Sequence, residues 1–78
     1  MPLFWNANIE TARWIGPDLQ FDAQTEAGRV VYVITGGRLR GTAQRTSFEV
    51  LSANLPRLKP IIVPLARGAK AGDTIRVN

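Results

Sequence analysis

The residues of this chain best suited to binding chemistry are its arginines. The 78-residue sequence holds ten Lys and Arg against six Asp and Glu, a formal net charge of +4. The densest basic group is Arg38, Arg40 and Arg45, and its first two members lie in the glycine-rich segment GGRLRG at 36–41. Glycines let a ligand approach the backbone closely, and guanidinium groups bind phosphate oxygens in pairs. The segment therefore permits phosphate contact, although it also suits a plain connection between a strand and a helix.

Two tryptophans, Trp5 and Trp14, form the second group with binding potential. Exposed aromatic rings beside arginines stack on nucleic-acid bases or form the centre of protein interfaces. If a helix covers one face of a sheet, one or both rings would lie on the other face; the alternative is that they fill the core. The remaining cations are spread almost evenly along the sequence, a pattern typical of a solvated surface. The candidate interaction residues are Trp5, Trp14, Arg38, Arg40 and Arg45.

Catalytic chemistry has little support in the residue types. The chain has no histidine and no cysteine, which removes the commonest general base, the commonest metal ligand and the most reactive nucleophile. Asp18 and Asp22 share one strand face, but at polar positions expected to meet solvent. No loop of the D-x-D-x-D-G kind provides carboxylates for a cation. We therefore expect a protein that is not an enzyme, with no catalytic residue, no cofactor and no metal.

The length and composition predict one domain over residues 1–78. A hydrophobic fraction of 45% is normal for a chain that folds around its own core. Because the chain has no cysteine, no disulfide bond can stabilise the fold. The N-terminal residues have no secretory pattern. The longest apolar run, 60–66, is far shorter than the roughly 20 residues that span a membrane. We expect a cytoplasmic protein without a membrane partner.

Residues 18–35 predict a β-hairpin. Leu19, Phe21 and Ala23 alternate with polar residues, the period of a half-buried strand. Gly28 suits the turn, and the β-branched run at 30–34 predicts a second, more buried strand. Before the hairpin two readings stay open. In one, 11–15 is a strand with Gly16-Pro17 as its turn; in the other, 3–5 is an edge strand and 6–17 a loop.

Residues 46–67 predict a long helix. Thr46 followed by Glu49 is a capping box, the signature of a helix start. Gly68 after Arg67 is a residue suited to the end of the helix. Between these two ends, apolar residues recur at steps of three and four over about five turns, as one face of a helix requires. These residues are Phe48, Leu51, Leu55, Leu58, Ile62 and Leu65.

Three prolines interrupt this stretch: Pro56, Pro60 and Pro64. At about 100° per residue they project together on the side opposite the apolar stripe. An interior proline costs about 3 kcal/mol, but on the solvent side water satisfies the freed carbonyl, and the helix bends around its core face. Two alternatives stay open: residues 60–66 as a strand beside the last strand, and a polyproline II docking segment.

The remaining elements complete the predicted fold. Thr35 can begin a short helical turn with Leu39 pointing inward, or the segment is a loop. Residues 74–77 alternate as a strand with Ile75 and Val77 on one face. The order strand, strand, helix, strand predicts an α+β domain: a small antiparallel sheet, with a possible N-terminal edge strand, covered on one face by one long, proline-bent helix.

Short motifs in this order resemble a family of small bacterial proteins catalogued as domain of unknown function 1488. The resemblance rests on Leu19-Gln20-Phe21-Asp22-Ala23, the Gly28 turn, Val33-Ile34-Thr35 with Leu39, and the closing GDTIRV. It implies a cytoplasmic ββαβ-type domain of about this size. It carries over no catalytic residue.

Two functional hypotheses follow from the sequence. The leading one is a non-enzymatic interaction domain that pairs with itself, as a homodimer, or with another protein through an open sheet face or an edge strand. The second is a basic nucleic-acid-binding domain. In it Arg38, Arg40 and Arg45 contact the phosphate backbone, and Trp5 or Trp14 stacks on bases.

Overall fold

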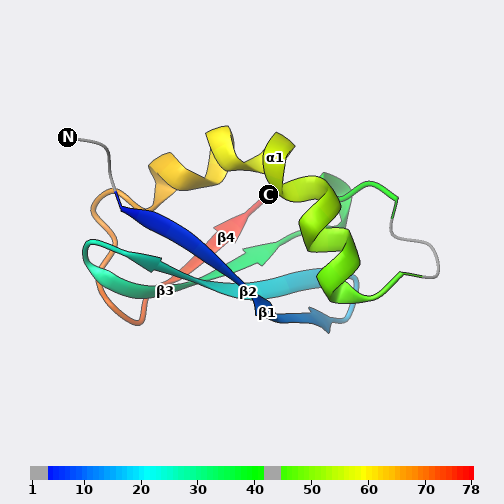
Figure 1. Cartoon of the computed structure of the whole chain (residues 1–78), viewed down its shortest axis with the longest axis horizontal. Coiled ribbons are helices and arrows are strands. Elements are labelled where there is room, and N and C mark those ends of the chain that lie inside the picture. Colours follow the sequence, from blue (N-terminus) through cyan, green and yellow to red (C-terminus); the bar gives the residue numbers. More distant parts are fainter. Residues whose placement is uncertain (1–3, 42–44) are drawn as a thin grey trace.

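A computed structural model of the protein, which describes residues 4–41 and 45–78, has one sheet and one long helix (Figure 1). The elements are β1 (Trp5–Ile15), β2 (Asp18–Thr25), β3 (Gly28–Ile34), the 3₁₀ turn η1 (Gly36–Arg38), α1 (Ser47–Leu65) and β4 (Thr74–Val77). The helix lies across one face of the sheet, so the predicted α+β class is confirmed. No helix among the described residues is long and apolar enough to cross a membrane.

The sheet is mixed, which corrects the expectation of a purely antiparallel one. Its strand order is β1-β2-β3-β4; β1 pairs antiparallel with β2, and β2 with β3, whereas β3 and β4 run parallel. Tight turns reverse the chain between the first three strands. Between β3 and β4 the chain crosses over through α1 and returns to its starting end, so β4 must run in the same direction as β3.

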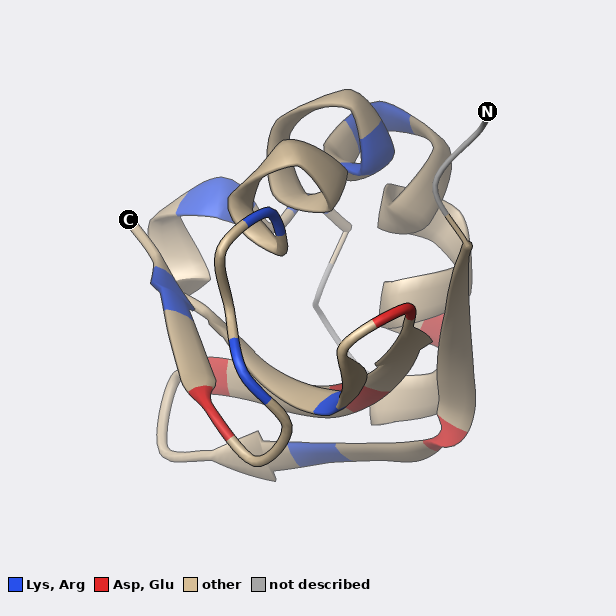
Figure 2. Ribbon diagram, turned by 90° about the vertical axis from the view of Figure 1, so that its left-hand side faces the viewer, with Lys and Arg blue, Asp and Glu red and all other residues tan. Residues whose placement is uncertain are grey.

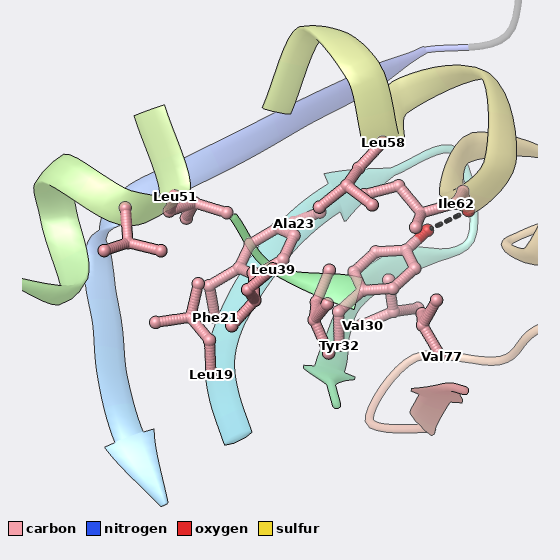
Figure 3. Close-up of a cluster of buried hydrophobic side chains, with 12 residues drawn as sticks. Leu19, Phe21, Ala23, Val30, Tyr32, Leu39, Leu51, Leu58, Ile62 and Val77 are labelled. Carbon is pink, nitrogen blue, oxygen red and sulfur yellow. Dashed lines mark hydrogen bonds between the residues drawn. The ribbon is translucent and has the colours of Figure 1, made fainter. Parts of the chain in front are cut away.

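The predicted hairpin supplies the sheet side of the core (Figure 3). The alternating apolar side chains of β2 and β3 face α1 and have no solvent exposure. They are Leu19, Phe21, Ala23, Val30, Tyr32 and Ile34. Ile75 and Val77 of β4 extend this layer, and Leu39 packs inward after η1, as expected. The helical turn at Gly36–Arg38 forms without a side-chain cap from Thr35.

The N-terminal strand contains the strand and the turn of the first alternative and is longer, and the loop of the second alternative is wrong. β1 includes residues 11–15, with a turn at Gly16-Pro17, and also residues 6–10, which the other alternative treated as loop. Its register with β2 shifts between Asn8 and Arg13. There the Thr11 hydroxyl accepts the main-chain N–H of Asp22 at 2.9 Å and donates to the Asn8 carbonyl at 2.8 Å. A side chain thus replaces part of the ladder, which lets one strand span the whole sheet edge.

The helix forms where its sequence signals place it. The capping box of Thr46 and Glu49 is present, and α1 runs through all three prolines, which are exposed. Residues 60–65 are therefore helical, and the strand and polyproline alternatives are wrong. The helix ends at Leu65, two residues before Arg67, and Gly68 follows in the turn with φ +82°.

The buried face of α1 is shifted from the predicted stripe. Leu51, Leu58 and Ile62 are buried, but Phe48 and Leu65 at the two ends are 52% and 44% exposed. Val50 and Asn54 lie in the core instead. Steps of three and four repeat every 3.5 residues, whereas the helix turns every 3.6, so a long stripe drifts around the axis and its ends leave the sheet.

One buried hydroxyl connects the sheet to the helix. Tyr32 of β3 donates to the Ile62 carbonyl of α1 at 2.9 Å (Figure 3). The same hydroxyl accepts the indole N–H of Trp5 at 3.0 Å. Its ring stacks on Phe21, with the centroids 5.3 Å apart. Burial raises the pKa of this phenol above its ordinary value, so the hydroxyl keeps its proton and its role as a donor.

We predict that Tyr32→Phe lowers the free energy of unfolding by about 1–3 kcal/mol, because it leaves the Ile62 carbonyl and the Trp5 indole N–H without this partner. Urea denaturation followed by circular dichroism measures the loss. The control is Trp5→Phe, which keeps an aromatic ring and the bond to Ile62, and its loss should be smaller. Equal stability of Tyr32→Phe and the parent protein would contradict the argument.

Candidate binding surface

The strand directions bring several distant segments to one end of the sheet. The register places Trp14 of β1, Leu19 of β2, Ile34 of β3 and Val77 of β4 in one row across the sheet. The segment after β3 and the start of α1 lie at the same end, on the right in Figure 1. The Ser47 hydroxyl donates to the Ala12 carbonyl at 2.7 Å, which fixes the beginning of α1 beside β1.

Five arginines gather at this end, which we call the basic end: Arg38, Arg40, Arg45, Arg57 and Arg76. The Arg57 guanidinium donates to the Arg38 carbonyl and to the side-chain oxygen of Asn54. Arg38 donates to the main-chain oxygen of Asn78 at 2.6 Å, and Arg76 donates to the side-chain oxygen of the same residue at 3.3 Å. These bonds connect the segment after β3, the middle of α1 and β4.

Asn54 holds the arginine-bearing segment against the helix. Its side chain accepts the N–H of Arg40 at 3.0 Å and donates to the Arg40 carbonyl at 2.9 Å. Only 3% of Asn54 is exposed. Arg45 reaches the same region, since its guanidinium lies 3.7 Å from where a side chain on Gly41 would begin. The three predicted arginines are therefore brought together.

Sequence reasoning missed Arg57, Arg76 and Asn54. The two arginines are distant from the Arg38–Arg45 group in the chain and join it only through the fold. The burial of Asn54 could have been predicted from the sequence. The residue lies three positions after Leu51 and four before Leu58, on the helix face that the apolar spacing assigns to the core.

Few carboxylates neutralise the basic end. Asp18 accepts the Gly36 N–H at 3.1 Å and lies 3.7 Å from Arg76. Glu49 caps the helix, and hydrogen bonds from Thr46, followed by the nearby charge of Arg45, lower the pKa of its carboxyl, so it is ionised at neutral pH. Both ion pairs among the described residues lie on the open face of the sheet, Arg76 with Asp18 at the basic end and Arg29 with Asp22 nearer the hairpin tip. The basic end keeps an excess of positive charge.

The glycines of GGRLRG have different roles. A side chain on Gly36 would begin 2.8 Å from the Pro17 carbonyl, so glycine is required there by close packing between two turns. Gly37 has open space around it. A ligand therefore has room to approach the backbone at Gly37. At position 36, packing against Pro17 by itself explains why the residue is glycine.

Exposed aromatic side chains lie at the basic end. Trp14, paired with Leu19, is 36% exposed, and Phe48 follows the Ser47 that is bonded to Ala12. Strands lie about 4.8 Å apart, so the row from Trp14 to Val77 covers roughly 14 Å. The aromatic rings therefore lie near the β1 edge and the guanidinium groups of Arg38 and Arg76 near the β4 edge, at the same end of the sheet.

Trp5 lies at the opposite end of the sheet. It pairs with Thr25 near the hairpin tip, and its ring packs edge-on against Tyr32, with centroids 6.1 Å apart. The Lys59 ammonium lies 5.7 Å from its ring centroid. The structure thus separates the two tryptophans, and only Trp14 accompanies the arginines.

The open face of the sheet is polar and carries neither tryptophan, which corrects that expectation. Paired residues point to the same side of a sheet, and the partner of Trp14, Leu19, points into the core beneath the helix. The open face carries Asp22, 9% exposed and 3.1 Å from Arg29. Seen from the hairpin end, acidic and basic segments are interspersed along the ribbon (Figure 2).

Among residues 4–41 and 45–78 no group of three or more acidic side chains is placed to hold a metal ion. No protein-family model, curated protein or solved structure matches the chain. The resemblance to domain of unknown function 1488 stays a prediction.

We predict that Asn54→Ala lowers the free energy of unfolding by about 1–3 kcal/mol, because Arg40 loses the partners of both its main-chain groups. Urea denaturation gives the value, with Ser52→Ala on the exposed side of α1 as the matched control. If both variants unfold at the same urea concentration, Asn54 does not hold the segment as described.

Proposed function

We propose that this domain is a non-enzymatic module that binds single-stranded nucleic acid at the basic end. The observation that carries the proposal is the gathering of arginines at one end of the sheet, where Trp14 of the edge strand β1 is also exposed. Guanidinium groups bind successive phosphates, and exposed aromatic rings stack on unpaired bases. Arg40 and Arg45, whose side chains make no ion pair with described residues, are the most available for phosphate.

The protein-interaction hypothesis requires the open sheet face or an edge strand, and both are less suited to binding a partner than the basic end. The open sheet face is charged and internally paired. Of the two edge strands, β1 has an irregular register in its middle and β4 has only four residues. Irregular and short edges are poor templates for strand addition. For this reason nucleic-acid binding becomes the first candidate here. A cytoplasmic location is part of the proposal.

We predict that the protein binds a fluorescein-labelled single-stranded oligonucleotide at low salt, with an affinity that falls steeply as salt rises. Fluorescence anisotropy measures both. Replacing Arg40 and Arg45 with Ala removes two phosphate contacts and should flatten the slope of log affinity against log salt by about 1.4.

The matched control is Arg67→Ala with Lys70→Ala, which removes the same charge from the opposite end of the sheet and should leave the slope unchanged. Trp14→Ala should weaken binding, whereas Trp14→Phe should keep most of it, because stacking needs a ring. A duplex of the same sequence should bind less tightly. Absence of binding at low salt, or an equal loss in the charge-matched control, rejects the proposal.

Self-association is the second candidate, supported by a separate observation at the same end. Trp14, Ile15 and Phe48 are large apolar side chains with exposed fractions of 36%, 46% and 52%. Aromatic residues beside arginines have the composition of protein-interface centres. A homodimer or a protein partner would cover them.

We predict for this candidate that the protein dimerises as its concentration rises and that Trp14→Ser with Phe48→Ser abolishes the dimer. Size-exclusion chromatography with light scattering measures the mass. The control pair is Ile61→Ser with Leu65→Ser, two exposed apolar residues late in α1. A strict monomer at all concentrations would remove self-association and leave nucleic acid as the partner to test.

A further inference from the structure

A pocket opens at the end of the molecule opposite the basic end. It lies between the tip of the β2–β3 hairpin, the start of β1 and the turn that follows α1, and its volume is about 270 Å³. Figure 2 views the molecule from this end. The lining residues are grouped by element: Phe4 and Trp5, then Thr25 to Ala27, then Val63 and Ala66 to Ala69.

The walls of the pocket are mainly apolar and one of them is held in place. Trp5 is fixed by its bond to the Tyr32 hydroxyl and by Lys59 beside its ring. Val63 and Ala66 at the end of α1 add aliphatic surface. An indole restrained in this way provides a surface that does not need to be ordered when a ligand arrives.

Two opposite charges complete the lining. Glu26, at the hairpin tip, accepts the Phe4 N–H with one oxygen at 3.2 Å, which leaves its second oxygen for a ligand. Arg67, after α1, provides a guanidinium. The two side chains form no ion pair with each other. The pocket therefore combines an apolar interior with one anion and one cation.

We propose that this pocket binds a free hydrophobic α-amino acid. The apolar side chain contacts Trp5 and Val63, the α-carboxylate pairs with Arg67, and the α-ammonium pairs with Glu26. Charge complementarity selects this ligand class: a simple carboxylate leaves Glu26 without a cation, and an amine leaves Arg67 without an anion. A residue within a peptide chain has neither charge. The volume suits one ring or branched chain, since pockets for drug-sized ligands hold about 300–1,000 Å³.

The test is a titration of the ¹⁵N-labelled protein with L-phenylalanine, followed by two-dimensional NMR. We expect shifts of the Trp5 indole N–H and of the amides of residues 66–69. Three analogues separate the contributions: 3-phenylpropionate lacks the ammonium, phenethylamine lacks the carboxylate, and N-acetylphenylalanine amide lacks both charges. Each should bind at least about tenfold more weakly than phenylalanine, which corresponds to one lost charged contact.

Variants of the two charged residues make the assignment specific. Glu26→Gln should weaken phenylalanine about tenfold and leave 3-phenylpropionate unchanged, whereas Arg67→Gln should weaken phenylalanine and leave phenethylamine unchanged. Lys70→Gln, an exposed neighbour outside the lining, is the matched control. All three positions are exposed, so the fold should persist.

Four results would overturn the proposal. They are no shift with phenylalanine, equal affinity for 3-phenylpropionate, equal affinity for phenethylamine, and equal affinity for N-acetylphenylalanine amide. The second and third would assign the pocket to acids or amines, and the last to peptide segments. Because the pocket and the basic end share no residue, either proposal can fail without the other.

Discussion

The bond from the Tyr32 hydroxyl to the Ile62 carbonyl is the contact on which the rest of the structure depends. The Ile62 carbonyl lies in the last turn of α1, where the Ala66 N–H bonds to the Val63 carbonyl instead, so it needs a partner from outside the helix. Tyr32 supplies it from the middle of the sheet, and its oxygen also accepts the Trp5 indole N–H. One buried group therefore connects β1, β3 and α1. The same contact holds Trp5 in place as a wall of the end pocket.

The crossover through α1 gives the molecule two chemically different ends. Because β4 runs parallel to β3, the ends of β1, β3 and β4 and the start of α1 lie on one side, together with all five arginines of the basic end. The hairpin tip, the start of β1 and the end of α1 lie on the other, where the pocket is. The two proposed binding sites therefore lie at opposite ends of the domain and share no residue.

Asn54 illustrates how a buried polar group can organise a surface. Its amide satisfies both main-chain groups of Arg40 and accepts from Arg57, so burial leaves its oxygen and nitrogen paired. Among the described residues no buried side-chain polar atom lacks a partner. Arg38 and Arg40 therefore project from a segment that is fixed by the core rather than held only by water, so less conformational freedom would be lost if a ligand bound there.

The sequence by itself determined the local features: the alternation that forms the β2–β3 hairpin, the capping box at Thr46, and the opposed apolar and proline faces of α1. These depend on neighbours within a few residues, where backbone geometry and periodicity decide. The tertiary structure alone decided the direction of β4, the joining of Arg57 and Arg76 to Arg38, and the different surroundings of Trp5 and Trp14. The end pocket also belongs to this group, since its walls come from three separate segments. Contacts between distant residues follow from how elements pack, and no local pattern in one sequence encodes that packing.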